Sequence, residues 1–358
     1  PPAAPARAVQ RCAAWLGRAL LPVLVLGSQV VAETGRVAAL ARAVAELGLP
    51  VFLAGMARGL LGREHPLQMR SSRKQALGEA DLVLVAGLPF DFRLGYGRHI
   101  GRRARLVAVN LDRAALYQNR LPALAVRARP GRFIEALAAA RPAAAGDWID
   151  WRTTLRGRDR VKDAECLEHC RKVDPLELCR ELDRRLPDDS LLVADGGDFA
   201  ATAAYLTRPR RPLSWLDPGV FGTLGVGAGF AMAAKLLRPE AEVWLLYGDG
   251  ALGYGLAEFD TFCRHRLPVI ALVGNDASWA QIARDQVALL GDDVATRLER
   301  SDYHRAAEAL GAKGLLVETT AQVPEAIQRA QTLAAQGHPV LINAHITTTD
   351  FRQGSLSL

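Results

Sequence analysis

Two apolar runs of this chain each end in an acidic residue. The run VWLLY is followed by Gly-Asp-Gly, which contains Asp249, and the run VIALV is followed by Gly-Asn-Asp, which contains Asp276. One strand–helix–strand repeat separates the two carboxylates, so both strand ends should open on the same edge of a parallel sheet. Two carboxylates at one place repel each other unless a cation lies between them, and oxygen ligands suit Mg²⁺ or Ca²⁺. The spacing therefore predicts a metal site.

The glycines beside Asp249 indicate what else binds there. Gly248 and Gly250 let the backbone approach a ligand closely, and free amide groups at a helix start attract anions. A lone Gly-Asp-Gly is usually an ordinary turn. The matching second loop favours a metal-bridged diphosphate site.

Two more glycine-rich segments belong to the same part of the chain. LLVADGGDF carries Asp198 and Phe199 after an apolar run, and PGVFGTLGVGAGFAM carries Gly222 and Leu224. Close helix packing explains the later glycines of the second segment, but not the short Gly222–Gly225 loop. We expect both segments to border the same ligand.

Composition limits the classes of protein to which the chain can belong. It has 358 residues, half of them hydrophobic, which is enough for two α/β domains. The net charge is +7, but the arginines are dispersed and no nucleic-acid-binding signature is present, so we expect no nucleic-acid partner. No apolar run reaches the roughly 18 residues of a membrane span, which predicts a soluble chain.

The cysteines predict neither disulfides nor a metal centre. Five cysteines form no even disulfide framework, which favours a reducing compartment. Cys166, His169 and Cys170 lie close together, but their spacing matches no common zinc site.

The elements that must position these residues form two series. Continuously apolar runs alternate with helical patterns in residues 21–142, and again in residues 174–358. Such runs are typical of parallel strands buried on both faces. We predict an α/β fold with two doubly wound parallel-sheet domains, at 1–142 and 174–358, joined by a charged helical connector at 143–173.

The strand-end motifs also carry a family resemblance. Gly-Asp-Gly, a spacer of about 25 residues and an Asn-containing turn, with Glu258 and Leu267-Pro268 between them, resemble the diphosphate-binding domain of thiamine-diphosphate enzymes. Residues 15–140, including GREHP and DFRLGYG, resemble the middle domain of the same superfamily. AEFDTF, RHRLPVIALVGNDASW, ARDQV and TDFRQGSLSL are most similar to its acetolactate synthase-like branch of 2-hydroxyacyl-CoA lyases.

The resemblance implies roles for individual residues. Asp249 matches the first Mg²⁺ ligand, and an ungapped count makes Asp276 the second, whereas a match to the family's Asn would choose Asn275. The Ser278 carbonyl would be the third protein ligand. The remaining expected contacts with thiamine diphosphate are Gly248, Gly250 and Ala251 at the diphosphate, Asp198 and Phe199 beside it, and Gly222 and Leu224 at the aminopyrimidine.

The resemblance also implies an activity. The implied reaction is the cleavage of 2-hydroxy fatty acyl-CoA to formyl-CoA and a shortened aldehyde, a step of fatty acid α-oxidation. The resemblance further implies that the enzyme is a homo-oligomer (dimer or tetramer) located at the endoplasmic reticulum membrane. The alternatives are an acetolactate synthase-type carboligase acting on pyruvate and an inactive truncated cofactor-binding partner. FAD is not expected, because residues 21–112 lack a Gly-x-Gly-x-x-Gly fingerprint.

No catalytic residue is expected within these 358 residues. The family's catalytic Glu belongs to an N-terminal pyrimidine-binding domain, and Glu258 is better explained as a structural carboxylate inside the helix that follows Gly-Asp-Gly. The opening Pro-Pro-Ala-Ala-Pro-Ala is typical of an interdomain linker, so we expect the chain to be the later part of a longer protein. We therefore expect the isolated chain to be inactive or nearly so.

Overall fold

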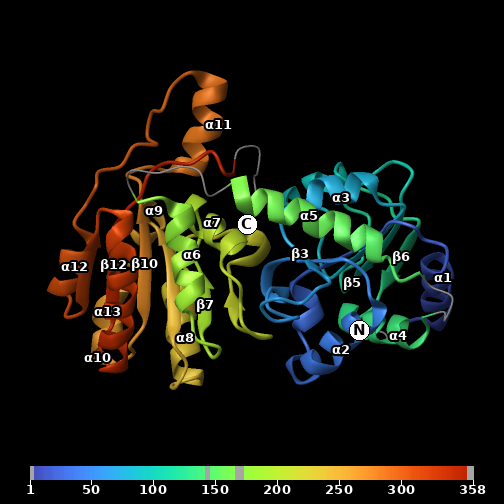
Figure 1. Ribbon diagram of the computed structural model, residues 1–358, viewed down its shortest axis with the longest axis horizontal. Helices are drawn as coiled ribbons and strands as arrows, with labels where there is room; N and C mark the ends of the chain where they lie inside the picture. The colour runs from blue at the N-terminus through green and yellow to red at the C-terminus, as the bar shows by residue number, and fades with distance from the viewer. Residues whose placement is uncertain (1–3, 142–145, 166–172, 353–358) are drawn as a thin grey trace. The chain divides into compact units, whose positions relative to one another are not determined.

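The computed structural model describes residues 4–141, 146–165 and 173–352 (Figure 1). Its contacts divide the chain into two compact units, Pro1–Glu165 with Arg211–Leu213, and Cys166–Arg210 with Ser214–Leu358. Cys166, His169 and Cys170 lie outside the described residues. The other three cysteines, Cys12, Cys179 and Cys263, are free thiols.

The first unit is built on a six-stranded parallel sheet with the order β3-β2-β1-β4-β5-β6. The two central strands consist of buried aliphatic residues throughout, as expected of strands covered on both faces. The strands are β1 (Pro22–Leu26), β2 (Val51–Leu53), β3 (Gln68–Met69), β4 (Leu82–Ala86), β5 (Arg105–Asn110) and β6 (Leu124–Arg127).

Helices cover this sheet. They are α1 (Ala6–Leu16), α2 (Val37–Leu47), α3 (Arg73–Glu79), α4 (Pro130–Ala139) and α5 (Ile149–Glu165), with short 3₁₀ helices η1 (Ser28–Val31), η2 (Thr34–Arg36), η3 (Gly55–Ala57) and η4 (Phe92–Gly97). Helix α5 falls within the predicted connector and packs on the first unit. The Trp151 indole donates a hydrogen bond to the Pro22 carbonyl at 3.1 Å. The Asp159 carboxylate accepts hydrogen bonds from the Arg70 and Ser71 amides at 2.9 Å.

The second unit has another six-stranded parallel sheet, with the order β11-β12-β10-β9-β7-β8. Its strands are β7 (Leu191–Ala194), β8 (Trp215–Leu216), β9 (Val243–Gly248), β10 (Ile270–Asn275), β11 (Lys313–Val317) and β12 (Val340–His345). The chain runs from β7 outward to β8, then returns to the other side of β7 as β9. The point where the winding direction changes therefore lies between β7 and β9, where ligands of such sheets bind.

Helices lie on both faces of the second sheet. They are α6 (Pro175–Arg185), α7 (Asp198–Leu206), α8 (Gly227–Leu237), α9 (Asp249–Leu252), α10 (Glu258–Arg264), α11 (Ala280–Leu290), α12 (Tyr303–Ala309) and α13 (Val323–Ala335), with 3₁₀ helices η5 (Gly219–Phe221) and η6 (Thr320–Gln322). One core contains residues of α6, α7 and α13, and a second contains residues of α8, α10 and α12. The predicted fold class, two doubly wound α/β domains, is confirmed.

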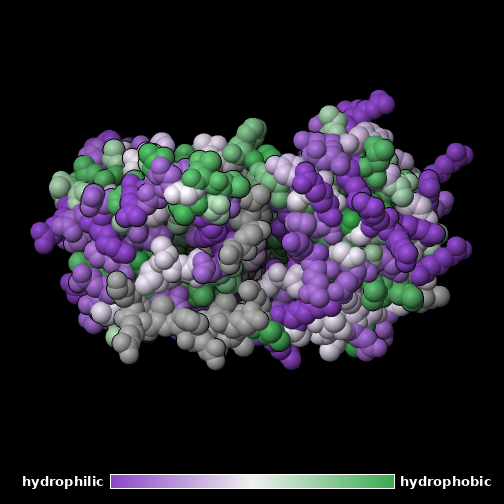
Figure 2. Space-filling model, turned by 90° about the horizontal axis from the view of Figure 1, so that it is seen from above, coloured by the Kyte–Doolittle hydropathy of each residue, from purple (hydrophilic) through white to green (hydrophobic). Residues whose placement is uncertain are grey.

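Helix α11 differs from the other described α-helices because none of its residues is buried. It projects beyond the sheet edge at which α9 follows β9 (Figure 1). Its exposed hydrophobic residues include Ile282, Leu289 and Leu290, and Figure 2 shows hydrophobic side chains gathered on this side of the second unit. Within the described part of the chain, no helix is both long and apolar enough to cross a bilayer.

Candidate functional site

A cavity of about 230 Å³ lies at the carboxyl ends of the strands of the second unit. It is lined by Gly196, Gly197, Asp198, Phe199, Gly222, Leu224, Gly248, Asp249, Gly250, Ala251, Gly274, Asp276, Ser278, Trp279, Ala280, Gln281 and Ile282. All the cofactor and metal residues predicted from the sequence line it, with the exception of Asn275. Sites for whole drug-sized ligands usually measure roughly 300–1,000 Å³, so this cavity suits one end of a larger cofactor.

Parallel pairing of β9 with β10 brings the two acidic loops together. Gly248 is in register with Gly274, so Asp249 and the turn at Asn275 leave the sheet at the same level. Strand β7 pairs with the other side of β9 and delivers the segment that contains Gly196 and Asp198. These loops meet beside the point where the winding direction changes.

Asp249 has an unsatisfied oxygen. Its side chain is buried, and Oδ1 accepts a hydrogen bond from the Gly250 amide at 2.9 Å. Oδ2 is also buried but has no hydrogen-bond partner among the described residues. Burial raises the pKa of Asp249 above its usual value. A buried carboxylate oxygen without a partner is unfavourable in water-free surroundings, and a cation would satisfy it.

Asp276 shares these surroundings. Burial, followed by the charges of Asp249 and Asp198, raises the pKa of Asp276 to about 7. A divalent cation between Asp249 and Asp276 would remove this repulsion, so the donor set fits Mg²⁺. No three His, Cys, Asp or Glu side chains in the described ranges form a metal cluster. A cation here would therefore need further oxygens, such as those of a diphosphate.

Asn275 is turned away from the cavity. Its side chain is fully buried, and its Nδ2 donates to Asn343 Oδ1 at 3.1 Å. Its Oδ1 accepts from the Ala277 amide at 3.2 Å, which tightens the turn and accompanies a positive φ of 59° at Ala277. Asn275 thus shapes the loop that presents Asp276, and the structure does not place its side chain among the lining groups.

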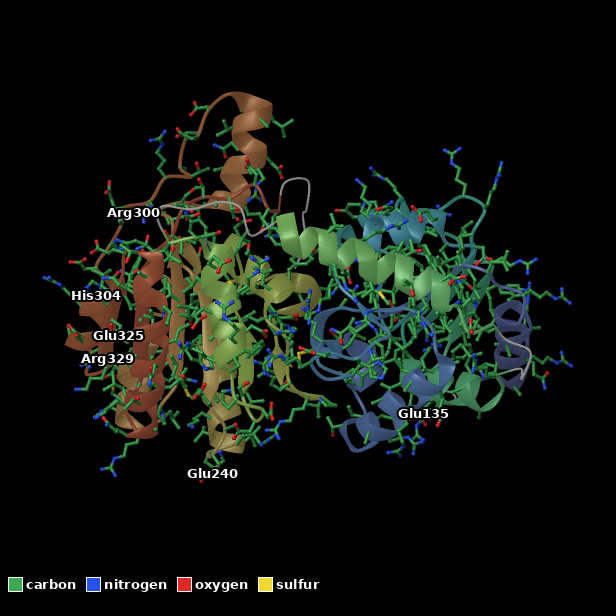
Figure 3. The ribbon with its side chains drawn as sticks, viewed as in Figure 1. Glu135, Glu240, Arg300, His304, Glu325 and Arg329 are labelled. Atoms are coloured by element: carbon green, nitrogen blue, oxygen red, sulfur yellow. The ribbon has the colours of Figure 1, made fainter. Side chains whose placement is uncertain are left out.

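Arg300 supports the same turn from outside. Its Nη1 donates to the Asn275 carbonyl at 2.9 Å and its Nη2 to the Ile346 carbonyl at 3.1 Å. Figure 3 shows Arg300 at the end of the segment that returns from α11. The guanidinium ties the end of β10 to the end of β12 and lies close enough to favour the ionised form of Asp276.

The glycine-rich loops are organised by Asp195, which sequence reasoning missed. The Asp195 carboxylate is fully buried and accepts hydrogen bonds from the amides of Gly196, Gly225 and Gly227 at 2.8, 2.9 and 2.6 Å. It therefore fixes the loop that carries Leu224 beside the first residues after β7. Asp195 directly follows an apolar run, and this position is the feature of the sequence that could have identified it.

Several residues beside the cavity were not predicted. Trp279 lies on the cavity lining with Gln281 and Ile282. Arg284 and Arg352 pair with Asp198 at 2.9 and 3.1 Å. Both arginines lie in segments that carry the family resemblance, ARDQV and TDFRQGSLSL, but nothing in the sequence connects them with Asp198.

Two other features do not belong to this cavity. Glu258 is the first residue of α10 and is not among the lining residues. A larger cavity of about 1010 Å³ lies in the first unit beside α3 and α5, and none of the predicted site residues lines it. The unsatisfied carboxylate oxygen, Oδ2 of Asp249, belongs to a residue that lines the smaller cavity.

Comparison with known proteins agrees with this site. Residues 9–137 match the central domain of thiamine pyrophosphate enzymes, and residues 195–344 match their C-terminal TPP binding domain. The chain is 49% identical over 369 residues to 2-hydroxyacyl-CoA lyase 2 of Mus musculus, covering 100% of this chain and 58% of that protein. It is 36% identical over 338 residues to an acetolactate synthase large subunit of Mycobacterium tuberculosis, covering 94% of this chain and 61% of that protein.

A solved structure shares the fold. The thiamine diphosphate-dependent 4-hydroxybenzoylformate decarboxylase of Rhodococcus jostii RHA1 superposes with a TM-score of 0.77 at 22% identity, over 98% of this chain and 66% of that chain. Two domain models that together cover most of the chain, the two parallel sheets and the strand-end cavity agree. The chain belongs to the thiamine pyrophosphate enzymes and contains their central and C-terminal TPP-binding domains.

Proposed function

We propose that this chain belongs to a thiamine-diphosphate-dependent carbon–carbon lyase. The enzyme would cleave a 2-hydroxy fatty acyl-CoA into formyl-CoA and an aldehyde one carbon shorter. The observation that carries the proposal is the 49% identity to a 2-hydroxyacyl-CoA lyase 2 across the whole of this chain. The chain spans 58% of that relative's length, so the activity of the whole protein is part of the proposal.

The cavity residues would hold the cofactor's diphosphate and its metal. Asp249 and Asp276 would bind Mg²⁺ with the Ser278 carbonyl, and the backbone of Gly250 and Ala251 would lie beside the diphosphate. Gly222 and Leu224 would meet the aminopyrimidine. When bound, thiamine diphosphate supplies an electron sink for the carbon–carbon bond that breaks. The residues of this chain would bind and orient it, with Trp279 and Ile282 on the cavity wall.

The catalytic acid is proposed to come from elsewhere. Within the described residues, the cavity lining contains no glutamate. We expect a pyrimidine-binding domain to provide one, in a homo-oligomer. We therefore expect the 358 residues alone to bind cofactor but to show little or no turnover. Ordinary activity of these residues with Mg²⁺, thiamine diphosphate and substrate would contradict this.

Product analysis tests which substrate the enzyme uses. The full-length enzyme is supplied in parallel with a 2-hydroxyacyl-CoA and with pyruvate, and the products are identified by mass spectrometry. The proposal predicts formyl-CoA and a shortened aldehyde from the first. Acetolactate from pyruvate, with no cleavage of the acyl-CoA, would instead support a carboligase. The similarity to an acetolactate synthase makes that the second candidate.

The cellular setting follows from the same similarity. We propose that the enzyme acts in fatty acid α-oxidation at the endoplasmic reticulum membrane as a dimer or tetramer. Fluorescence microscopy of the tagged full-length protein and light scattering of the purified protein test the two parts separately. Diffuse fluorescence outside the reticulum would contradict the first part, and a monomeric mass would contradict the second.

A further inference from the structure

Asp198 lines the cofactor cavity and is held by two arginines from distant parts of the chain. Its Oδ2 pairs with Arg284 Nη2 at 2.9 Å, and its Oδ1 pairs with Arg352 Nη1 at 3.1 Å. Arg284 belongs to α11, and Arg352 lies in the C-terminal segment beyond β12. Three elements are therefore joined at one carboxylate on the cavity wall.

The C-terminal partner is deeply buried. The Arg352 side chain is 1% exposed and that of Asp198 is 11% exposed. Burial lowers the pKa of Arg352, and the charge of Asp198 opposes this shift. The neighbouring Phe351 ring packs edge-on against Tyr205 of α7, with the ring centroids 6.0 Å apart. A buried guanidinium is unfavourable without a paired anion, so the segment depends on Asp198 for its position.

The charged side chains that line the cavity give the two arginines bound to Asp198 a role. Asp198, Asp249 and Asp276 line the same cavity. A divalent cation bound by Asp249 and Asp276 would offset those two charges. Asp198 would then remain as an anion beside the place where an anionic diphosphate must enter. Like charges at close range oppose binding unless a cation compensates them.

We propose that Arg284 and Arg352 form a clamp that offsets the charge of Asp198 and fixes its orientation, and so determines how tightly the cavity binds Mg²⁺–thiamine diphosphate. The two arginines are positioning residues that act through Asp198. The residues Phe351 and Arg352, beyond β12, are thereby part of the cofactor site. This inference rests on the proposed function, because it assumes that the cofactor binds in this cavity.

A second aspartate in the same unit offers a matched control. Asp183 is also paired with two arginines, Arg208 and Arg210, and the Arg210 and Asp183 side chains are 2% and 4% exposed. None of these three residues lines the cavity. Arg210→Met therefore removes a buried guanidinium of the same kind without touching the cofactor site.

The test is calorimetric titration of the full-length protein with thiamine diphosphate at saturating Mg²⁺. Arg352→Met should raise the Kd at least about tenfold, because it removes a buried positive charge beside the anion site and leaves Asp198 held by Arg284 alone. Arg284→Met should act in the same direction, and it keeps the proposal testable if the Arg352 variant does not fold. Adding Asp198→Asn to Arg352→Met should restore the Kd to within about threefold of the wild-type value, since the net charge of Asp198 and its arginines returns to that of the wild type.

The control separates affinity from stability. Arg210→Met should lower the melting temperature but leave the Kd of the folded protein unchanged. An unchanged Kd in Arg352→Met, or a double variant no better than the single one, would overturn the clamp and leave the cofactor proposal standing. A wild-type protein that fails to bind thiamine diphosphate would overturn both.

Discussion

Asn275 and Asp276 are adjacent residues with opposite surroundings. Asn275 is fully buried and hydrogen-bonded to Asn343, whereas Asp276 lines the cavity near Asp249. The family's asparagine therefore has two candidates here, and the direction of the side chains separates them. Asn275 serves the fold of the turn, and Asp276 is available to a cation.

Substitution of each residue should give a distinct result. Asp276→Ala should weaken Mg²⁺-dependent binding of thiamine diphosphate by more than the roughly 10–100-fold typical of losing an outer-shell partner. Asn275→Ala should weaken binding less but lower the free energy of unfolding by about 1–3 kcal/mol, because it leaves buried partners unsatisfied. Calorimetry and urea denaturation measure the two effects. A larger loss of affinity in Asn275→Ala would assign the metal to Asn275.

The sequence predicted those residues of the cavity that follow apolar runs. Asp249, Asp276 and Asp198 each come directly after a strand or one short turn later, so strand patterning was sufficient to place them. Arg284 and Arg352 reach Asp198 through tertiary packing, 86 and 154 residues away along the chain, so strand patterning could not bring them to the cavity.

At the level of elements, the cavity depends on close packing of α7 against β10. A Cβ added at Gly274 would overlap the Phe199 ring, and both residues line the cavity. Strand β10 therefore requires glycine at this point so that the first turn of α7 can lie over it. Phe199 in turn closes one wall of the site.

Gly274→Ala should disturb this packing. Overpacking in a well-filled interior costs about 1–3 kcal/mol, so the free energy of unfolding should fall by that amount and cofactor affinity should fall with it. Gly229→Ala is the matched control. Gly229 lies in α8 with nothing near its added Cβ, so it should stabilise the protein by about 0.4–1 kcal/mol. Equal stability of the two variants in urea denaturation would contradict the packing argument.

Long central elements were predictable, and short or exposed ones were not. Continuous apolar runs in the sequence predict the strands β1, β4, β5, β9, β10 and β12. Amphipathic periodicity predicts the helices α2, α4, α6 and α13. The edge strands β3 and β8 have only two residues each and present no periodicity. Helix α11 buries no residue, so it carries no hydrophobic pattern facing a core.

At the scale of the whole molecule, each unit has a hydrophobic core of its own. The core of the first unit is a single cluster, and the second unit has one cluster on each face of its sheet. Units with separate cores can unfold separately. All lining residues of the strand-end cavity belong to the second unit.

Cofactor binding should therefore stabilise one unit selectively. Scanning calorimetry of the chain should resolve two transitions. Mg²⁺ and thiamine diphosphate at 100 times the Kd should stabilise the second unit by about 2.7 kcal/mol and leave the first transition in place. A single transition, or an equal shift of both, would show that the units are thermodynamically coupled.

The central claim is that the cavity at the ends of β7, β9 and β10 is a metal-dependent diphosphate site. Calorimetric titration of the full-length protein with thiamine diphosphate, with Mg²⁺ and then with EDTA, tests it most directly when wild-type protein is compared with Asp249→Ala. We predict binding by the wild-type protein with Mg²⁺, and its loss both with EDTA and in Asp249→Ala. Binding that persists without metal, or in Asp249→Ala, would contradict the claim.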